Sequence, residues 1–338
     1  MKTRHSSYKW IHGAVISLLL TTAYPAHVYG QQESIVVDPV TGDYTITYQG
    51  LDLEGNPKWH QVVYVPATKN DPLVRSKFRL NDKHIITYSY KVQNRLESKQ
   101  AIDGFRGFAS HVISGSQTTP KDWDGNILPD FDSAGQESGL RVNWSFDTSG
   151  GLVPGKSQGG FSYESSHLPG VGVARLTGAV DALNGFPDEG PGDDNPIYSE
   201  FRKLMLSDFV PRHVTAPKIR VPDPFDTSVV LAGIQNHIKQ DLVSMSLVEP
   251  VFASQLDRIL QAAIDAAKLN NTKAVRENLK DLRKLLKKEH GNVDKEDDEV
   301  ESGPKKVADK QSPIDKLAAK VLDFDFKYVE QRVKGDKD

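Results

Sequence analysis

The sequence predicts an α+β fold with two domains, in which an N-terminal antiparallel β-sandwich of jelly-roll or immunoglobulin-like type precedes a small C-terminal helical bundle. Between residues 31 and 182, apolar residues recur at every second position between clusters of Gly and Pro. This period of two is typical of short antiparallel strands with one buried face. From residue 225 onward, apolar residues recur every three to four positions, which is the period of amphipathic helices.

Residues 1–30 have the pattern of a secretory signal peptide. Lys2, Arg4 and Lys9 precede the apolar run Ala14 to Leu20, and Val28-Tyr29-Gly30 ends the segment. This order of charged, apolar and small residues predicts cleavage after Gly30 and export to the periplasm or the extracellular space. The apolar run is far shorter than the ~20 residues of a spanning helix, so we expect no membrane insertion after cleavage.

The composition narrows the class of function. The chain has 338 residues with 42 basic and 45 acidic side chains, and removal of residues 1–30 leaves 39 basic ones and a net charge of −6. A nucleic-acid binder would show a basic stripe instead, so we expect no nucleic-acid partner. The sequence contains no cysteine. Disulfides and thiol chemistry are therefore excluded, and stability must come from the hydrophobic core.

Seven or eight short strands are expected in the β-sandwich domain at 31–182. In the clearest of them, Leu140, Val142, Trp144 and Phe146 alternate with Arg141, Asn143 and Ser145. Trp59 and Trp144 lie in strands and are expected in the core, whereas Trp123 lies in a polar segment and is expected at the surface. The expected strands are at 35–37, 44–48, 59–65, 86–92, 105–113 (the least regular), 140–146, 161–163 and 171–176.

A glycine-rich stretch within this domain matches two catalytic motifs without their context. Residues 150–157 read GGLVPGKS and fit the phosphate-loop pattern, and residues 155–159 read GKSQG and fit the nucleophile elbow. Both motifs require a helix directly after the loop. Here two glycines and alternating aromatic residues follow, which predicts a strand, and Pro154 lacks the N–H that a phosphate cradle needs. We therefore expect a turn and no nucleotide binding.

The segment 121–137 is rich in acidic residues and is expected to be a loop. Asp122, Asp124, Asn126, Asp130 and Asp132 offer oxygen ligands at alternating positions, which suits calcium. The spacing departs from the EF-hand rule, so a solvated loop without metal is the competing interpretation. No other cofactor is indicated. Asp130 and Asp132 also form a carboxylate pair of the kind that flanks a glycosidic bond in sugar hydrolases.

The C-terminal half is expected to be helical after a connector. Residues 183–224 are rich in Pro and Gly and contain one short helix signal at Asn195-Pro196, while 209–221 looks extended and suits an additional strand. Residues 225–333 carry four amphipathic stripes and are expected to form a four-helix domain. Charged residues dominate 291–312, where we expect a flexible loop.

Parts of the chain resemble known families. The runs LDRILQAAIDAAKLNNTKAVRENLKDLRKLL at 256–286 and IDKLAAKVLDFDFKYV at 314–329 resemble the helical module called FIMAH, which is found near the C-terminus of secreted bacterial proteins. The motifs VNW, LVPGKS, GGFSY and LPG in the strand region resemble secreted bacterial β-domains of unknown function. The resemblance implies a secreted bacterial protein of this architecture, and it implies no activity and no catalytic residues.

Two functions fit these observations. The first is an exported, non-enzymatic binding or structural module with an unidentified exported or cell-surface partner. The second is a secreted carbohydrate- or phosphate-active hydrolase with its site in the acidic segment 121–137. No histidine pair has metal-site spacing such as H-E-x-x-H. The non-enzymatic module is therefore the preferred interpretation.

Processing provides the first test. Because residues 1–30 have the three regions of a signal peptide in order, the exported form should begin at Gln31. Intact-mass measurement on protein recovered outside the cytoplasm checks this expectation. A mature chain that still carries Met1 to Gly30 would contradict it.

Overall fold

The computed structural model describes residues 32–52, 54–131, 137–146, 150–179, 195–290, 300–302 and 312–335. Every element described below belongs to one compact unit, which lies within Glu33–Asp338. The predicted signal peptide at 1–30 lies outside the described residues. Within the described part of the chain, no helix has the length and apolar character that a membrane crossing requires.

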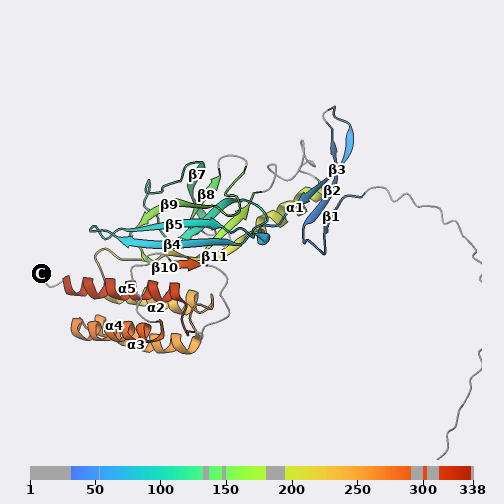
Figure 1. Cartoon of the computed structure of the whole chain (residues 1–338). Helices are drawn as coiled ribbons and strands as arrows, with labels where there is room; N and C mark the ends of the chain where they lie inside the picture. Colours follow the sequence, from blue (N-terminus) through green and yellow to red (C-terminus); the bar gives the residue numbers. More distant parts are fainter. Residues whose placement is uncertain are drawn as a thin grey trace, which may run out of the picture. The chain divides into compact units, whose positions relative to one another are not determined.

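The fold is α+β, with antiparallel sheets first and helices after them, as the sequence predicts (Figure 1). One sheet has five strands, in the order β11 (Val210–Ile219), β10 (Leu168–Gly178), β6 (Ile102–Ala109), β8 (Glu137–Phe146), β7 (Trp123–Phe131). A second has four, in the order β12 (Val300–Ser302), β4 (Pro72–Leu80), β5 (Ile86–Asn94), β9 (Ser157–Ser165). A small third sheet comprises β1 (Ser34–Val37), β2 (Tyr44–Leu51) and β3 (Pro57–Tyr64).

Aromatic side chains fill the space between the five-stranded and four-stranded sheets. Trp144 of β8 is fully buried and stacks on Phe105 of β6 with ring centroids 5.2 Å apart. From the opposite sheet, Tyr163 lies 6.2 Å from Trp144, and Tyr90 lies 5.5 Å from Phe105. Such ring pairs add to the stabilisation from burial itself. The two sheets thus form a β-sandwich, and the prediction that Trp144 is a core residue is confirmed.

The surface position expected for Trp123 is wrong. Its side chain is only 6% exposed and lies 5.3 Å from Phe146 and 5.0 Å from Phe161. The reason is that the acidic segment 121–137 is not a loop in its described part: β7 pairs with β8 along its length. Trp59, the other tryptophan expected in the core, is half-buried on the small third sheet.

The helical half has the predicted elements. Helix α1 (Pro196–Ser207) begins at Asn195, whose side chain accepts a hydrogen bond from the Ile197 N–H, and β11 is the strand expected at 209–221. The later helices are α2 (Thr227–His237) with its π-helical extension η2 (Ile238–Leu242), α3 (Pro250–Lys268), α4 (Thr272–His290) and α5 (Lys316–Gly335). Strand β12 lies inside the expected flexible loop 291–312 and pairs with β4; most of that loop lies outside the described residues.

The helices share a core with the β-sandwich. Phe324 of α5 packs edge-to-face on Phe78 of β4 with centroids 4.8 Å apart, and buried residues of both sheets and all four C-terminal helices form one continuous cluster. The division into separate domains near residue 225 stays a prediction.

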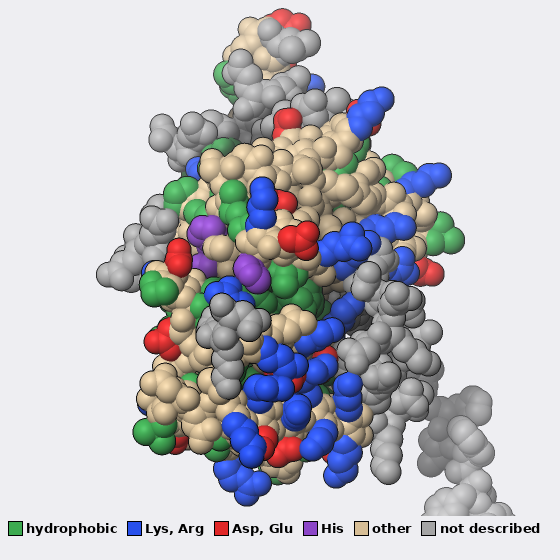
Figure 2. Space-filling model, turned by 90° about the vertical axis from the view of Figure 1, so that its left-hand side faces the viewer, with side chains coloured by type: hydrophobic (Ala, Val, Ile, Leu, Met, Phe, Trp, Pro, Cys, Tyr) green, Lys and Arg blue, Asp and Glu red, His purple; other side chains and the backbone are tan. Residues whose placement is uncertain are grey.

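Lys and Arg side chains gather over the helical part of the face shown in Figure 2. Helix α4 contributes to this basic character, because its sequence has seven basic and three acidic residues.

Helix α5 buries three acidic side chains in different ways. Asp323 receives two hydrogen bonds from the Arg283 guanidinium at 2.8 and 3.3 Å, and Glu330 lies 3.6 Å from Arg283. Asp325 is fully buried, and neither of its carboxylate oxygens has a hydrogen-bond partner. Burial raises the pKa of Asp325 well above its usual value. Burial therefore favours the neutral form of this carboxyl over the ionised form.

The two aspartates should respond oppositely to removal. Asp325→Ala deletes an unpartnered polar group and should leave the free energy of unfolding unchanged or increased. Asp323→Ala leaves Arg283 without its best partner and should cost about 1–3 kcal/mol. Urea denaturation of both variants measures this. A larger loss for Asp325→Ala than for Asp323→Ala would show that the buried carboxyl is needed for the fold.

Candidate functional site

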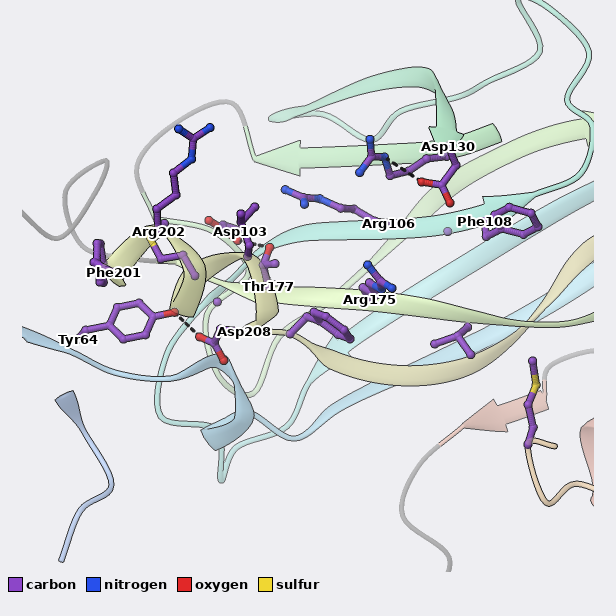
Figure 3. A pocket seen from close by; sticks show the side chains of 18 of the residues that line it. Tyr64, Asp103, Arg106, Phe108, Asp130, Arg175, Thr177, Phe201, Arg202 and Asp208 are labelled. Atoms are coloured by element: carbon purple, nitrogen blue, oxygen red, sulfur yellow. Dashed lines mark hydrogen bonds and ion pairs between the residues drawn. The ribbon is translucent and has the colours of Figure 1, made fainter. Parts of the chain in front are cut away.

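A cleft of about 870 Å³ lies along the outer face of the five-stranded sheet, beside α1 (Figure 3). Its floor carries Arg106 from β6, Arg141 from β8 and Arg175 from β10. Its opposite wall is one face of α1. A volume in this range is typical of sites for small organic ligands, so the cleft is the candidate functional site.

The three arginines face the cleft because their neighbours in the chain face the core. Phe105 and Val142 are fully buried, and Arg175 stands between two buried residues of β10. Successive side chains of a strand point to opposite faces of the sheet. Burial of the apolar neighbours therefore places Arg106, Arg141 and Arg175 together on the outer face.

The strand register brings two of these arginines directly opposite each other. Arg175 of β10 pairs with Arg106 of β6, and Arg141 lies diagonally across on β8, because Arg106 pairs with Asn143. Like charges at opposed positions destabilise a sheet. Burial in the cleft, then repulsion from Arg141 and Arg175, lowers the pKa of Arg106, although its side chain still reaches solvent.

Counter-charges in the cleft only partly balance these cations. The Nε of Arg141 lies 4.0 Å from Asp130 Oδ1, at the limit for an ion pair, and the dashed line in Figure 3 marks this contact. The Arg175 guanidinium lies 4.4 Å above the Phe209 ring instead of a carboxylate. In the described part of the chain, neither Arg106 nor Arg175 forms an ion pair. The arrangement leaves two guanidinium groups available to a ligand.

Asp103 lies at the end of this floor. The Thr177 hydroxyl donates a hydrogen bond of 2.8 Å to Asp103 Oδ1. Thr177 pairs with Gly104, where a Cβ would lie 2.2 Å from the Thr177 hydroxyl oxygen, so a glycine is required for this contact. Burial raises the pKa of Asp103, while the Thr177 hydrogen bond and the charge of Arg106 act in the opposite direction. Because the effect of burial is the largest, the ionised form of the Asp103 carboxyl is disfavoured beside the arginines.

The opposite wall is held in place by the small third sheet. Phe201 of α1 packs edge-to-face on Tyr64 of β3 at 5.2 Å, within a separate buried cluster. Asp208, just after α1, accepts hydrogen bonds from the Tyr64 hydroxyl and, at 2.7 Å, from the Ala67 N–H. The carboxylate thus fixes the end of α1 to the third sheet. The helix is therefore a firm wall for the cleft.

The structure describes four of the five predicted calcium ligands and places them in sequence along one strand and the turn before it. Asp122 lies in the turn before β7, and Asp124, Asn126 and Asp130 lie along the strand. At ~3.3 Å per residue, about 20 Å of strand separates Asp124 from Asp130. Among the described residues, no group of three or more His, Asp or Glu is placed to hold a metal ion, and Asp132 lies outside them. Of the four predicted ligands that the structure describes, Asp130 alone lines the cleft.

The sequence prediction does not include the arginine cleft. Alternation marks Arg141 as facing away from the core, and the same signal applies to Arg106 and Arg175. The missing information is that β10, β6 and β8 are neighbours. Strand order depends on contacts between residues far apart in the chain, which a local pattern does not contain.

The phosphate-loop pattern at 150–157 forms a turn, as predicted. Gly155 has a φ of +82°, Lys156 is exposed, and β9 begins directly at Ser157. A strand in place of a helix means that no helix N-terminus points at the loop. The predicted turn and following strand are therefore confirmed, and the absence of nucleotide binding stays a prediction.

The raised pKa of Asp103 gives a pH test. A carboxyl with a raised folded-state pKa contributes most to stability below its usual value of 3.8, and the contribution is lost as pH rises. Asp103→Asn should therefore gain stability relative to the wild type as pH rises from about 3 to 7. Urea denaturation across this range measures the difference.

Asp38 is a matched control with the opposite sign. The Val40 and Thr41 N–H groups donate to its carboxylate and hold its pKa below 3.8. Its stabilising effect is present above that value and lost in acid, so Asp38→Asn should lose stability relative to the wild type as pH rises. Equal slopes for the two variants would refute the role given to burial at Asp103.

Comparison with known proteins adds one structural similarity. No protein-family model and no curated protein sequence matches the chain. A crystal structure of an uncharacterized protein from Nocardia farcinica, reported to reveal an immunoglobulin-like fold, matches 35% of this chain and 92% of its own. The sequence identity is 19% and the TM-score is 0.24. A similarity of this size has no bearing on function.

Proposed function

We propose that the protein is an exported, non-enzymatic binding module that holds an anionic ligand in the arginine cleft. The observation that carries this proposal is the placement of Arg106 directly opposite Arg175. Two opposed cations that form no ion pair with any described residue cost stability in the free protein. A phosphate, sulfate or carboxylate group between them replaces repulsion by two charge-assisted interactions.

Export is part of the proposal. The signal-peptide pattern at 1–30 and the resemblance of 256–286 and 314–329 to the FIMAH module support a secreted bacterial protein. The net charge of the mature chain is negative, so a cationic cleft is a local property and not part of a general basic surface. An anionic ligand met outside the cytoplasm suits these features.

The hydrolase alternative rests on the carboxylate pair Asp130 and Asp132 in the segment 121–137. Two carboxylates must converge on the scissile bond of a substrate. Of this pair, Asp130 lines the cleft and Asp132 lies outside the described residues, so the pair stays a prediction. A binding function needs only the cationic floor that the described residues provide.

Ligand-induced stabilisation tests the proposal. Phosphate, sulfate and citrate, each titrated at constant ionic strength with chloride as the balance, should raise the melting temperature in a saturable way. Stabilisation follows RT ln(1 + [L]/Kd), or about 2.7 kcal/mol at a hundredfold excess over Kd. The substitution Arg106→Gln should abolish the saturable part of this rise in melting temperature. In chloride alone, the same variant should be as stable as the wild type or more so, because the repulsion is relieved.

Arg79→Gln is the matched control. Arg79 is an exposed residue of β4 in the other sheet, so the substitution changes the net charge equally without touching the cleft. This variant should respond to the anions as the wild type does. Sulfate and phosphate also stabilise proteins by exclusion from the surface. If Arg106→Gln and Arg79→Gln respond identically to the anions, exclusion from the surface alone explains the stabilisation, and the proposal is refuted.

A further inference from the structure

The two walls of the cleft differ in chemistry. The sheet floor carries the arginines, whereas α1 contributes Tyr198, Phe201, Arg202, Met205 and Leu206. These five positions follow the spacing i, i+3, i+4, i+7 and i+8, so they form one face of the helix. Four of the five are apolar or aromatic. A ligand in the cleft therefore meets cations on one side and a mainly apolar helix face on the other.

Packing within the protein does not account for the whole apolar face of α1. Ile197 and Phe201 are buried in the cluster with the third sheet, and Tyr198 and Met205 pack against that cluster in part. Leu206 lies outside the cluster and is 72% exposed. A leucine at the mouth of a cleft, in line with Tyr198 and Met205, is available for contact with a ligand.

The size of the cleft also favours an organic ligand over a small inorganic anion. Its volume of about 870 Å³ lies in the range of sites that enclose organic ligands of drug size. An inorganic phosphate or sulfate between Arg106 and Arg175 would leave most of this space open. Met205 adds a flexible side chain that adapts to apolar groups of different shape.

We infer that the ligand is an amphiphilic organic anion, with its charged group between Arg106 and Arg175 and its hydrocarbon part along Tyr198, Met205 and Leu206. This inference rests on the proposed anion-binding function and specifies the class of ligand. Binding of the charged group gives orientation, and burial of the apolar part gives most of the affinity. No covalent step is involved.

Calorimetry with two alkyl phosphates tests the inference. Octyl phosphate and ethyl phosphate carry the same head group and differ by six methylenes, and each buried methylene contributes about fourfold in affinity. Octyl phosphate, used below its micelle concentration, should bind at least about tenfold more tightly than ethyl phosphate. Octan-1-ol, which lacks the anion, should bind far more weakly than octyl phosphate.

Two exposed leucines provide matched variants. Leu206→Ser should weaken octyl phosphate binding by about three- to tenfold and reduce the advantage of octyl over ethyl phosphate. Leu269→Ser changes a leucine that is 80% exposed at the end of α3, away from the cleft, and should leave binding of both phosphates unchanged. Because both side chains are exposed, neither substitution should disturb the fold.

The outcomes separate the two proposals. Equal affinity for octyl and ethyl phosphate would overturn the amphiphile inference and leave the anion site standing. Equal affinity for octan-1-ol and octyl phosphate would overturn the anion site itself. A chain that binds neither phosphate would overturn both.

Discussion

The alternation of side chains in β6, β8 and β10 is the constraint on which both the core and the cleft depend. Phe105, Val142 and Trp144 must face inward to fill the sandwich. Because the period of a strand is two, the same register turns Arg106 and Arg175 outward. A slip of one residue would exchange the two sets, placing arginines in the core and aromatic rings in solvent. Packing of the core therefore fixes the cationic floor.

The sequence pattern predicts those strands and helices whose apolar residues recur with a single regular period, either two for a strand or three to four for a helix. Strand β8 and helix α3 are clear examples, since Val142 and Trp144 alternate with polar residues and the buried residues of α3 recur every three to four positions. Strand β7 was missed because Gly125 and Pro129 interrupt its pattern; proline is tolerated at the sheet edge, where β7 lies. The cleft was missed for a different reason, because it depends on strand order, which is set by long-range contacts.

The charges of the cleft differ in kind from those of the helices. Lys273, Lys280, Lys284 and Lys288 of α4 are exposed, so water screens their charges, whereas Arg283 of the same helix pairs with the buried Asp323. Arg106 and Arg175 lie opposed in a partly enclosed cleft, with a raised-pKa carboxyl at Asp103 and an aromatic ring at Phe209 as neighbours. Under the proposed function, the repulsion in the free protein is replaced by attraction to the bound anion. A compromise between stability and activity of this kind is common at binding sites.

A double-mutant cycle measures the central claim directly. The free energy of unfolding is compared for the wild type, Arg106→Gln, Arg175→Gln and the double variant, first in chloride at low ionic strength and then with saturating octyl phosphate. We expect an unfavourable coupling of about 0.2–1 kcal/mol between the two arginines in chloride, and a favourable coupling with the anion bound. A coupling of zero under both conditions would contradict this expectation.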